Sequence, residues 1–249
     1  SFFNTLIASA PASVENALYR WDPTGVYNSY VDGVASPANF NTVIPAMQGF
    51  WVRTDASATL NLDNSIRITN PNSATGTLYK TNSSSNEPLF RLELEGEGKK
   101  VETVIRFKDQ ASTNFDKAYD AYFMRGDIAG EAEFATASNR GGLRINSLPE
   151  LNGQAVEIQL HQVTNTAGNY QISLSEFTNF NSNDRIILRD SLTGLSTLLN
   201  NGPYSFVGNP GDITDRFKIT VIADVNSTEN IAEIQATFSA YKSKDALII

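Results

Sequence analysis

The sequence predicts an all-β protein, an antiparallel sandwich or jelly-roll-like fold with two β units in tandem. Apolar and polar residues alternate over several stretches of roughly five to eight residues, which is typical of strands with one buried face. Turn-forming residues separate these stretches about every ten residues, as they do in sandwiches and jelly rolls. Helix patterns are short and weak, so the fold class does not depend on them.

Residues 1–80 are predicted to form the first β unit. In "LYRWDPTGVYNSY", a Pro and a Gly occupy the turn between two aromatic-rich segments. The later stretch "IPAMQGFWVR" begins another strand after a Pro and a Gly. Because successive side chains of a strand point to opposite faces, we expect Phe50 and Val52 in a core and Trp51 on the other face.

Residues 81–86, "TNSSSN", are small and polar and are predicted to link the first unit to a main β-sandwich over residues 87–224. Alternating strands of this second unit include "LFRLELE", "VETVIRF", "AVEIQL", "NYQISL" and "RFKITVIA". The first two are joined by "EGEGKK", which favours a hairpin. Residues 225–249 are predicted to hold a second linker and the first strand of a further unit.

Composition excludes several classes of function. The chain has a formal net charge of −8 at pH 7, so it lacks the excess of basic residues that is typical of nucleic-acid-binding proteins. The chain has no cysteine and one histidine, which excludes disulfides, thiolate metal sites, cysteine nucleophiles and multi-histidine metal sites. It has no apolar run of about 18 residues, so no membrane-spanning helix is predicted. No nucleophile elbow occurs, and no catalytic residue is assigned.

Several stretches resemble, in their order, one region of a known group of proteins. They are "LYRWDPTGVYNSY", "VIPAMQGFWVRT", "FDKAYDAYFMRGD", "GGLRINSLPEL", "GNYQISL" followed by "RIILRDSLTG", and "PYSFVGNPGDITDRFKI". Together they resemble the β-sandwich region upstream of the C-terminal sorting domain in large secreted or surface Bacteroidota proteins exported by the type IX secretion system. The resemblance covers most of Ala17 to Ile222.

Both ends of the chain depart from that pattern. The tail "YKSKDALII" resembles the first strand of the sorting domain, which is therefore expected to be truncated here. Members of the group usually have another strand before "LYRWD", so the first unit is expected to be partial.

The resemblance implies a non-catalytic structural or adhesive module of a large cargo protein, such as an adhesin, that is secreted or held at the outer-membrane cell surface. The implied partners are the type IX translocon and outer-membrane shuttle components, reached through the C-terminal region. Function depends on sites rather than folds, so two alternatives stay open. One is a carbohydrate- or calcium-binding module of an extracellular enzyme or adhesin, with surface glycans as partners. The other is an enzyme fragment whose catalytic domain lies upstream.

The ligand candidates are Trp21 and Trp51. A carbohydrate platform needs exposed, coplanar aromatic rings flanked by hydrogen-bonding groups. Burial in a core is the competing interpretation, because it stabilises the fold by roughly 2–3 kcal/mol for a large apolar side chain.

Asp109, Asp116 and Asp120 are the calcium candidates, because calcium prefers several loop oxygens as ligands. Their spacing matches no EF-hand, and a solvated acidic turn is the competing interpretation. No other cofactor is predicted. Ser191, in "DSL", fits a form that resembles Bacteroidota O-glycosylation sites, although a turn role for Asp190 explains the same residues.

Overall fold

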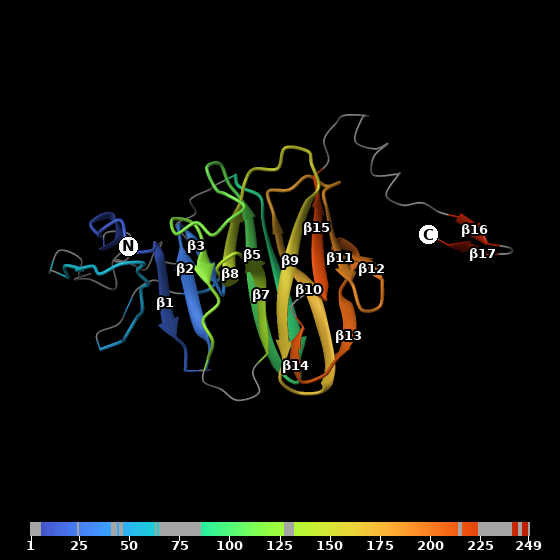
Figure 1. The fold of residues 1–249 in the computed structure, drawn as a ribbon, viewed down its shortest axis with the longest axis horizontal. Helices are drawn as coiled ribbons and strands as arrows, with labels where there is room; N and C mark the ends of the chain where they lie inside the picture. Colours follow the sequence, from blue (N-terminus) through green and yellow to red (C-terminus); the bar gives the residue numbers. More distant parts are fainter. Residues whose placement is uncertain are drawn as a thin grey trace.

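The computed structural model describes residues 6–23, 25–40, 44, 47–62, 64, 86–126, 132–213, 216–223, 241–243 and 246–248. Within these residues the regular structure is almost entirely β, which confirms the predicted all-β, sandwich-like class (Figure 1). Most of the two predicted linkers, residues 81–85 and 225–240, lies outside the described residues.

The N-terminal sheet consists of three antiparallel strands: β1 (Ala17–Trp21), β2 (Tyr27–Val31) and β3 (Val34–Ser36). Its register places Trp21 opposite Tyr27. Trp51 forms an antiparallel bridge with Tyr19, so the "GFWVR" stretch runs beside β1. Two backbone hydrogen bonds between these residues, of 2.8 and 2.9 Å, hold it there.

The alternation in "GFWVR" places its side chains as the sequence predicts. Phe50 and Val52 pack against the cluster around Leu18 on one face of the N-terminal sheet. Trp51 lies directly opposite Tyr19 and therefore shares the other face with it. Trp51 is 43% exposed, so it is neither a core residue nor fully open to water.

The large sheet has twelve strands, followed along the chain as β4 (Leu89–Gly96), β5 (Lys99–Phe107), β6 (Ala121–Tyr122), β7 (Glu133–Ser138), β8 (Gly141–Leu148), β9 (Val156–Thr164), β10 (Gly168–Thr178), β11 (Arg185–Asp190), β12 (Ser196–Leu198), β13 (Tyr204–Gly208), β14 (Gly211–Ile213) and β15 (Phe217–Ile222). A 3-10 turn, Leu199–Asn201, follows β12. The strand order is β12-β11-β15-β9-β7-β8-β5-β4-β10-β13, with β14 beside β9 and β6 beside β8. The pairs are antiparallel except β5 with β8, which run parallel and so depart from a purely antiparallel sheet.

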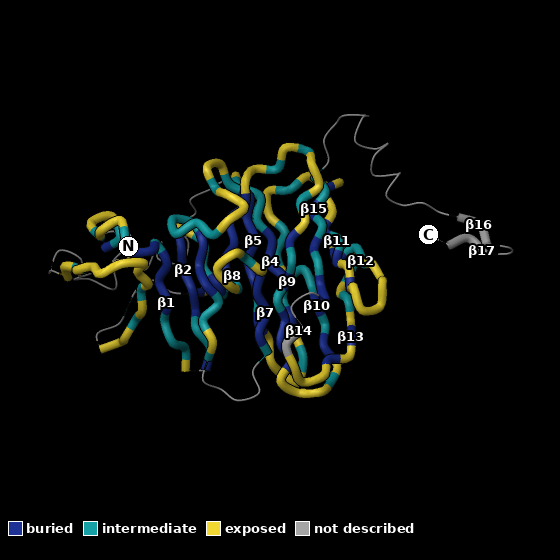
Figure 2. Tube along the Cα trace, viewed as in Figure 1, coloured by how far each residue is buried: buried dark blue, intermediate teal, exposed yellow. Residues whose placement is uncertain are grey.

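The large sheet folds over on itself around one apolar core. Phe90, Leu92 and Leu94 of β4 belong to the same buried cluster as Ile219 and Val221 of β15, although the two strands are far apart in the sheet order. A core shared in this way is the arrangement of a sandwich. Buried residues follow the strands through the centre of the molecule (Figure 2).

The outer face of β4 and β5 is also buried, which alternation alone does not predict. On β5, Val104 and Arg106 are 0% and 2% exposed, while Ile105 and Phe107 belong to the sandwich core. Arg91 on β4 is 7% exposed. A polar position in an alternating strand ordinarily faces water, and that expectation is wrong here because the N-terminal sheet covers this face.

We call the contact between the N-terminal sheet and the outer face of β4, β5, β6 and β8 the seam. Its apolar part is one buried cluster: Ala17, Tyr19, Val31, Val104, Ala121, Tyr122, Leu143 and Ile145. The Tyr19 hydroxyl accepts a 2.8 Å hydrogen bond from the backbone N–H of Tyr122. The seam therefore fixes the N-terminal sheet against the outside of the sandwich.

Near the end of the chain, β16 (Tyr241–Ser243) and β17 (Ala246–Ile248) form a two-stranded antiparallel hairpin. The single strand predicted for this tail is thus a pair of short strands. Among the described residues, no helix is long and apolar enough to cross a membrane.

Candidate functional site

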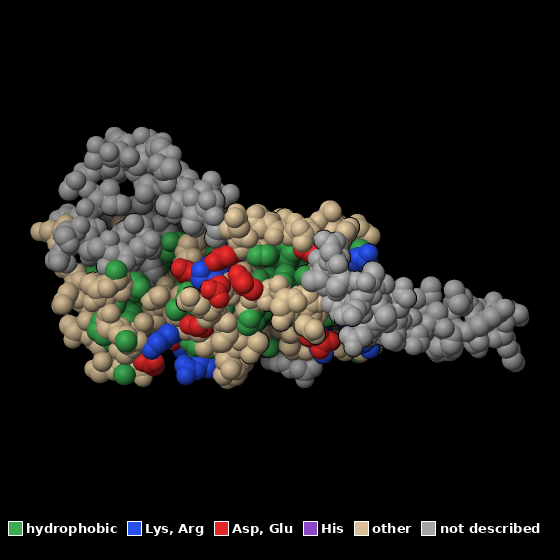
Figure 3. Space-filling view, turned by 90° about the horizontal axis from the view of Figure 1, so that it is seen from above, with side chains coloured by type: hydrophobic (Ala, Val, Ile, Leu, Met, Phe, Trp, Pro, Cys, Tyr) green, Lys and Arg blue, Asp and Glu red, His purple; other side chains and the backbone are tan. Residues whose placement is uncertain are grey.

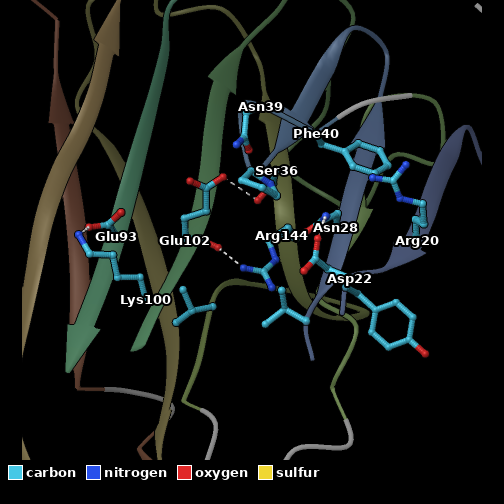
Figure 4. A pocket seen from close by; sticks show the side chains of 14 residues that line it. Arg20, Asp22, Asn28, Ser36, Asn39, Phe40, Glu93, Lys100, Glu102 and Arg144 are labelled. Atoms are coloured by element: carbon cyan, nitrogen blue, oxygen red, sulfur yellow. Dashed lines mark hydrogen bonds and ion pairs between the residues drawn. The ribbon is translucent and has the colours of Figure 1, made fainter. Parts of the chain in front are cut away.

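A polar cleft opens beside the seam, between the N-terminal sheet and strands β4, β5 and β8 (Figure 4). Its volume is about 430 Å³. Its polar lining includes Arg20, Asp22, Asn28, Ser36, Asn39, Glu102 and Arg144. We call it the seam cleft. Two units that are distant in sequence form one concave surface there, and such junctions are common places for ligand sites.

Glu102 on β5 is an acid held in a fixed position. Its Oε1 accepts hydrogen bonds of 2.8 Å from Ser36 Oγ and 2.9 Å from Arg91 Nη1. Arg91 in turn donates to the backbone carbonyl of Ala35 at 2.7 Å and pairs with Glu176. In the described part of the chain, Oε2 of Glu102 has no hydrogen-bond partner. One acceptor atom is therefore available on a carboxylate that cannot easily turn away.

Arg144 on β8 supplies a cation that is also held in place. It is 5% exposed, and its Nη1 donates a 2.7 Å hydrogen bond to the backbone carbonyl of Glu102 (Figure 4). Its guanidinium carbon lies 4.6 Å from the centre of the Phe123 ring, a cation–π distance. The guanidinium plane is thus set by contacts on two sides.

The N-terminal sheet provides the other half of the cleft. Asn28 is 4% exposed, and its Nδ2 donates to Asp22 Oδ2 at 3.2 Å. The Arg20 guanidinium lies 4.5 Å from the centre of the Phe40 ring. Figure 4 shows Arg20, Asp22 and Phe40 across the cleft from Glu102. Amide, carboxylate and guanidinium groups therefore face each other across one small space.

The charges of the cleft are balanced. Its charged side chains are three cations and three anions: Arg20, Lys100, Arg144, Asp22, Glu93 and Glu102. The Lys100 ammonium contacts Glu93 at 2.8 Å. This balance differs from the net charge of −8 of the whole chain. Acidic and basic side chains also lie side by side on the face seen in Figure 3. The cleft therefore does not select an ion of either sign by its net charge.

Both tryptophan candidates contact Tyr27, and we call the three residues the aromatic row. The Tyr27 ring centre is 4.9 Å from that of Trp21 and 5.3 Å from that of Trp51, and both contacts are edge-to-face. Trp21 is half-buried, whereas Trp51 is exposed. Tyr27 also lines the seam cleft. The structure thus brings the two predicted ligand residues together next to the cleft. Their rings stand at 73° and 83° to the Tyr27 ring, so the three rings do not form a coplanar platform.

Two of the three calcium candidates, Asp116 and Asp120, bond to backbone N–H groups of the protein. Asp116 Oδ1 accepts a 2.9 Å hydrogen bond from the backbone N–H of Ala118. Asp120 is 0% exposed, and its two carboxylate oxygens each accept a 2.7 Å hydrogen bond, from the backbone N–H of Ser147 and of Asp116. Burial raises the pKa of Asp120 to about 7, and these N–H groups and Arg106 only partly oppose it. Asp109 is exposed. No group of three or more metal-binding side chains occurs within the described residues, so nothing there adds support to the calcium prediction.

Ser191 is exposed in the turn after β11. Its neighbour Asp190 is 0% exposed and accepts hydrogen bonds from Arg216 Nε and Nη2 at 3.1 and 2.9 Å, from the Tyr204 hydroxyl at 2.7 Å and from the Leu192 N–H at 2.9 Å. Burial alone would raise the pKa of Asp190, but the bonds and charge of Arg216 outweigh it and lower the pKa to about 2. Asp190 therefore has a turn and ion-pair role, and glycosylation of Ser191 stays a prediction.

Arg106 joins the two sheets through the seam. Its Nη1 and Nη2 donate to the backbone carbonyl and to Oδ2 of Asp32, at 3.0 and 2.9 Å. Its Nε donates to Ser147 Oγ at 2.8 Å. Glu87 lies 3.6 Å from Nη1 and pairs with Lys108 at 2.7 Å. We call these residues the Arg106 network; it ties the turn after β2 to the outer face of β5.

Arg91, Glu102 and Arg106 are not recognisable as site residues from the sequence alone. Each occupies a polar position of an alternating strand, where exposure to solvent is the ordinary interpretation. A usable signal would be an arginine inside a strongly apolar strand such as "VETVIRF", because a buried arginine needs a partner elsewhere in the chain. The sequence does not say where that partner lies.

The fold and cleft define a class: an all-β sandwich with a small N-terminal sheet docked on its outside and a polar cleft at the junction. The chain belongs to the family described as "Domain of unknown function (DUF8693)", which matches residues 4–221. That match includes the N-terminal sheet and nearly all of the large sheet. No curated protein and no solved structure matches the chain.

Proposed function

We propose that the chain is a non-catalytic structural and adhesive module of a large secreted or cell-surface protein, exported as cargo of a type IX-like secretion system. Its partners in export are the translocon and outer-membrane shuttle components, which contact the C-terminal region. The export part of the proposal rests on the ordered resemblance of the sequence stretches to regions upstream of sorting domains.

The observation that supports a structural role is the Arg106 network. Relative motion is the default for two units joined by a small or polar interface. Here a guanidinium that is 2% exposed bonds both the backbone and the side chain of Asp32 in the other unit. The buried polar groups therefore serve to fix the two units in one orientation, which suits a spacer between domains.

Protease treatment of intact cells tests the location. In the organism that encodes the full precursor, an antibody against this chain should lose its signal when intact cells are treated with proteinase K. A strain without a functional type IX translocon should retain the signal inside the cell. Protection from protease in the otherwise unaltered strain would contradict the proposal, as would an unchanged surface signal in the translocon mutant.

The non-catalytic part has its own test. The purified chain should release no product from a panel of polysaccharide, peptide and ester substrates. Hydrolysis that survives further purification and disappears in a variant of this chain would make it an enzyme.

Carbohydrate binding is the second candidate function, and a specific observation favours it. Trp21, Tyr27 and Trp51 form one aromatic row, and Tyr27 lines a cleft that is rich in planar polar side chains. Aromatic surface beside hydrogen-bonding groups suits a sugar, which presents both apolar ring faces and hydroxyl groups. Such binding would give the module an adhesive role toward surface glycans.

A further inference from the structure

We propose that the seam cleft is the binding site for a neutral oligosaccharide, whose hydroxyl groups bond to Glu102, Asn39 and the Asp22–Asn28 pair. This inference rests on the second candidate function, carbohydrate binding, and assigns its site and ligand class. The structural role proposed above does not depend on it.

The balance of charges points to a neutral ligand. A phosphate or sulfate group in the cleft would meet Asp22 and Glu102, and an ammonium group would meet Arg20 and Arg144. A hydroxyl group both donates and accepts hydrogen bonds, so it can satisfy carboxylate oxygens and guanidinium or amide N–H groups in the same space. A polyhydroxylated, uncharged molecule therefore fits the lining better than an ion does.

The acceptor and donor groups are organised before any ligand binds. Ser36 and Arg91 both bond to Oε1 of Glu102, which leaves Oε2 as the acceptor for a ligand hydroxyl. Asn28 is bonded to Asp22, and Arg144 is fixed by its bond to the β5 backbone. Groups that are already ordered lose little entropy on binding, which favours affinity.

The size and the walls of the cleft suit a sugar chain. A volume of about 430 Å³ lies within the range of roughly 300–1,000 Å³ that small-molecule sites occupy. Tyr27 supplies aromatic surface within the lining, whereas Phe40 is 8% exposed and its ring lies beside the Arg20 guanidinium. Because Tyr27 also contacts Trp21 and Trp51, a longer oligosaccharide can extend from the cleft along the aromatic row.

The cleft is formed by both units, which gives the inference a second readout. Ser36 and Asn28 come from the N-terminal sheet, whereas Glu102 and Arg144 come from the large sheet. A ligand that contacts both sides binds only while the seam is closed. It should therefore raise the melting temperature, and the rise should grow with the ligand concentration.

The experiment is a glycan array followed by titration. The array carries uncharged hexose, deoxyhexose and N-acetylhexosamine oligomers beside sialylated and sulfated ones. The uncharged oligomer that binds best is then titrated by calorimetry into the unmodified chain and into Asn39→Ala, Glu102→Gln and Trp51→Ala. Glu157→Gln is the matched control, because Glu157 is an exposed acid on β9 that does not line the cleft.

We expect Asn39→Ala and Glu102→Gln each to weaken binding by about tenfold or more, the effect of losing a hydrogen bond that a ligand needs. Glu157→Gln should bind normally. Asn39 is exposed, so its replacement tests the cleft even if Glu102→Gln disturbs the Arg91 contact. The oligomer should also raise the melting temperature of the unmodified chain and raise that of Asn39→Ala less.

Other outcomes would overturn the inference in distinguishable ways. If Trp51→Ala abolishes binding while both cleft variants bind normally, carbohydrate binding stands and the cleft is the wrong site. If only sialylated or sulfated oligomers bind, the neutral ligand class is wrong. If no oligomer binds, both the inference and the second candidate function are wrong, while the structural role is decided separately by protease treatment of cells.

Discussion

The sandwich core and the seam are both buried, but different side chains hold them together. The core is lined by alternate apolar residues such as Phe90, Leu92 and Ile219. The seam combines an apolar cluster with the buried arginines Arg91 and Arg106, each of which donates a hydrogen bond to the N-terminal unit. An apolar core tolerates many combinations of residues, whereas a buried charge requires a particular partner. The core therefore defines the fold of the sandwich, and the seam defines how the N-terminal sheet is oriented on it.

We expect the largest loss of stability where a substitution leaves a buried charge without its ion-pair partner. Arg216→Ala removes the guanidinium that pairs with Asp190 at 2.9 Å, and Asp190 is 0% exposed. An orphaned buried carboxylate should destabilise the sandwich by about 3–5 kcal/mol. Urea unfolding of the variant measures this loss.

Arg189→Ala is the control, because Arg189 is an exposed arginine on the same strand as Asp190. It should change the free energy of unfolding by less than about 0.5 kcal/mol. Similar losses for both variants would mean that the Asp190 pair contributes no more than a surface charge.

Asp120, which directly precedes the seam strand β6, should make the stability depend on pH. Its folded-state pKa of about 7 lies above the ordinary 3.8, so the folded protein holds a proton that the unfolded chain releases. The stabilisation that this proton provides is fully present below about pH 4 and is lost as the pH rises through 7. We expect the free energy of unfolding to fall by on the order of 2–4 kcal/mol over that range.

Asp190 acts in a different window, which separates the two carboxylates. Its pKa of about 2 means that its stabilising contribution is present above about pH 4 and is lost as the pH falls through 2. Asp120→Asn should flatten the pH dependence of the free energy of unfolding between pH 4 and 7. It should leave the loss of stability at lower pH, which belongs to Asp190, unaltered. An NMR titration of the Asp120 carboxyl carbon checks the same proton directly, and a midpoint near 4 would refute the assignment.

Arg106→Ala should have a smaller effect than Arg216→Ala. Its partners Asp32 and Glu87 keep side-chain exposures of 38% and 22%, so water can solvate them once the guanidinium is gone. We expect a loss of about 1.5–3 kcal/mol, the range for hydrogen bonds to a charged group. Amide hydrogen exchange should speed up in β1–β3 and stay slow in β9, β11 and β15. Uniformly faster exchange would mean that the seam and the core unfold together.

The sequence predicts the core better than the seam, for a physical reason. Alternation identifies Phe90, Leu92 and Leu94 because burial of one face is a local property of a strand. The burial of Arg106 depends on Asp32, which is 74 residues away, and no local pattern encodes that pairing. The same limit applies to the seam cleft. Trp21 and Trp51 attract attention as aromatic residues, but their common neighbour Tyr27 and the fixed Glu102 emerge only from the packing of the two units.

The smallest loss of stability is expected from a substitution that disturbs packing at the edge of the core, away from the seam. A Cβ at Gly96 would lie 2.2 Å from Cδ1 of Tyr170, whose ring covers this glycine from the neighbouring strand. Gly96→Ala should therefore displace the ring from its stacking on Phe206 and destabilise the protein by about 1–2 kcal/mol. Gly49→Ala is the matched control, since nothing lies within 4 Å of its added Cβ. Hydrogen exchange in β1–β3 should be unchanged in both variants. If Gly96→Ala instead loosened the N-terminal sheet, strain in the core would reach the seam, and the two regions would not be separable in the way their side chains suggest.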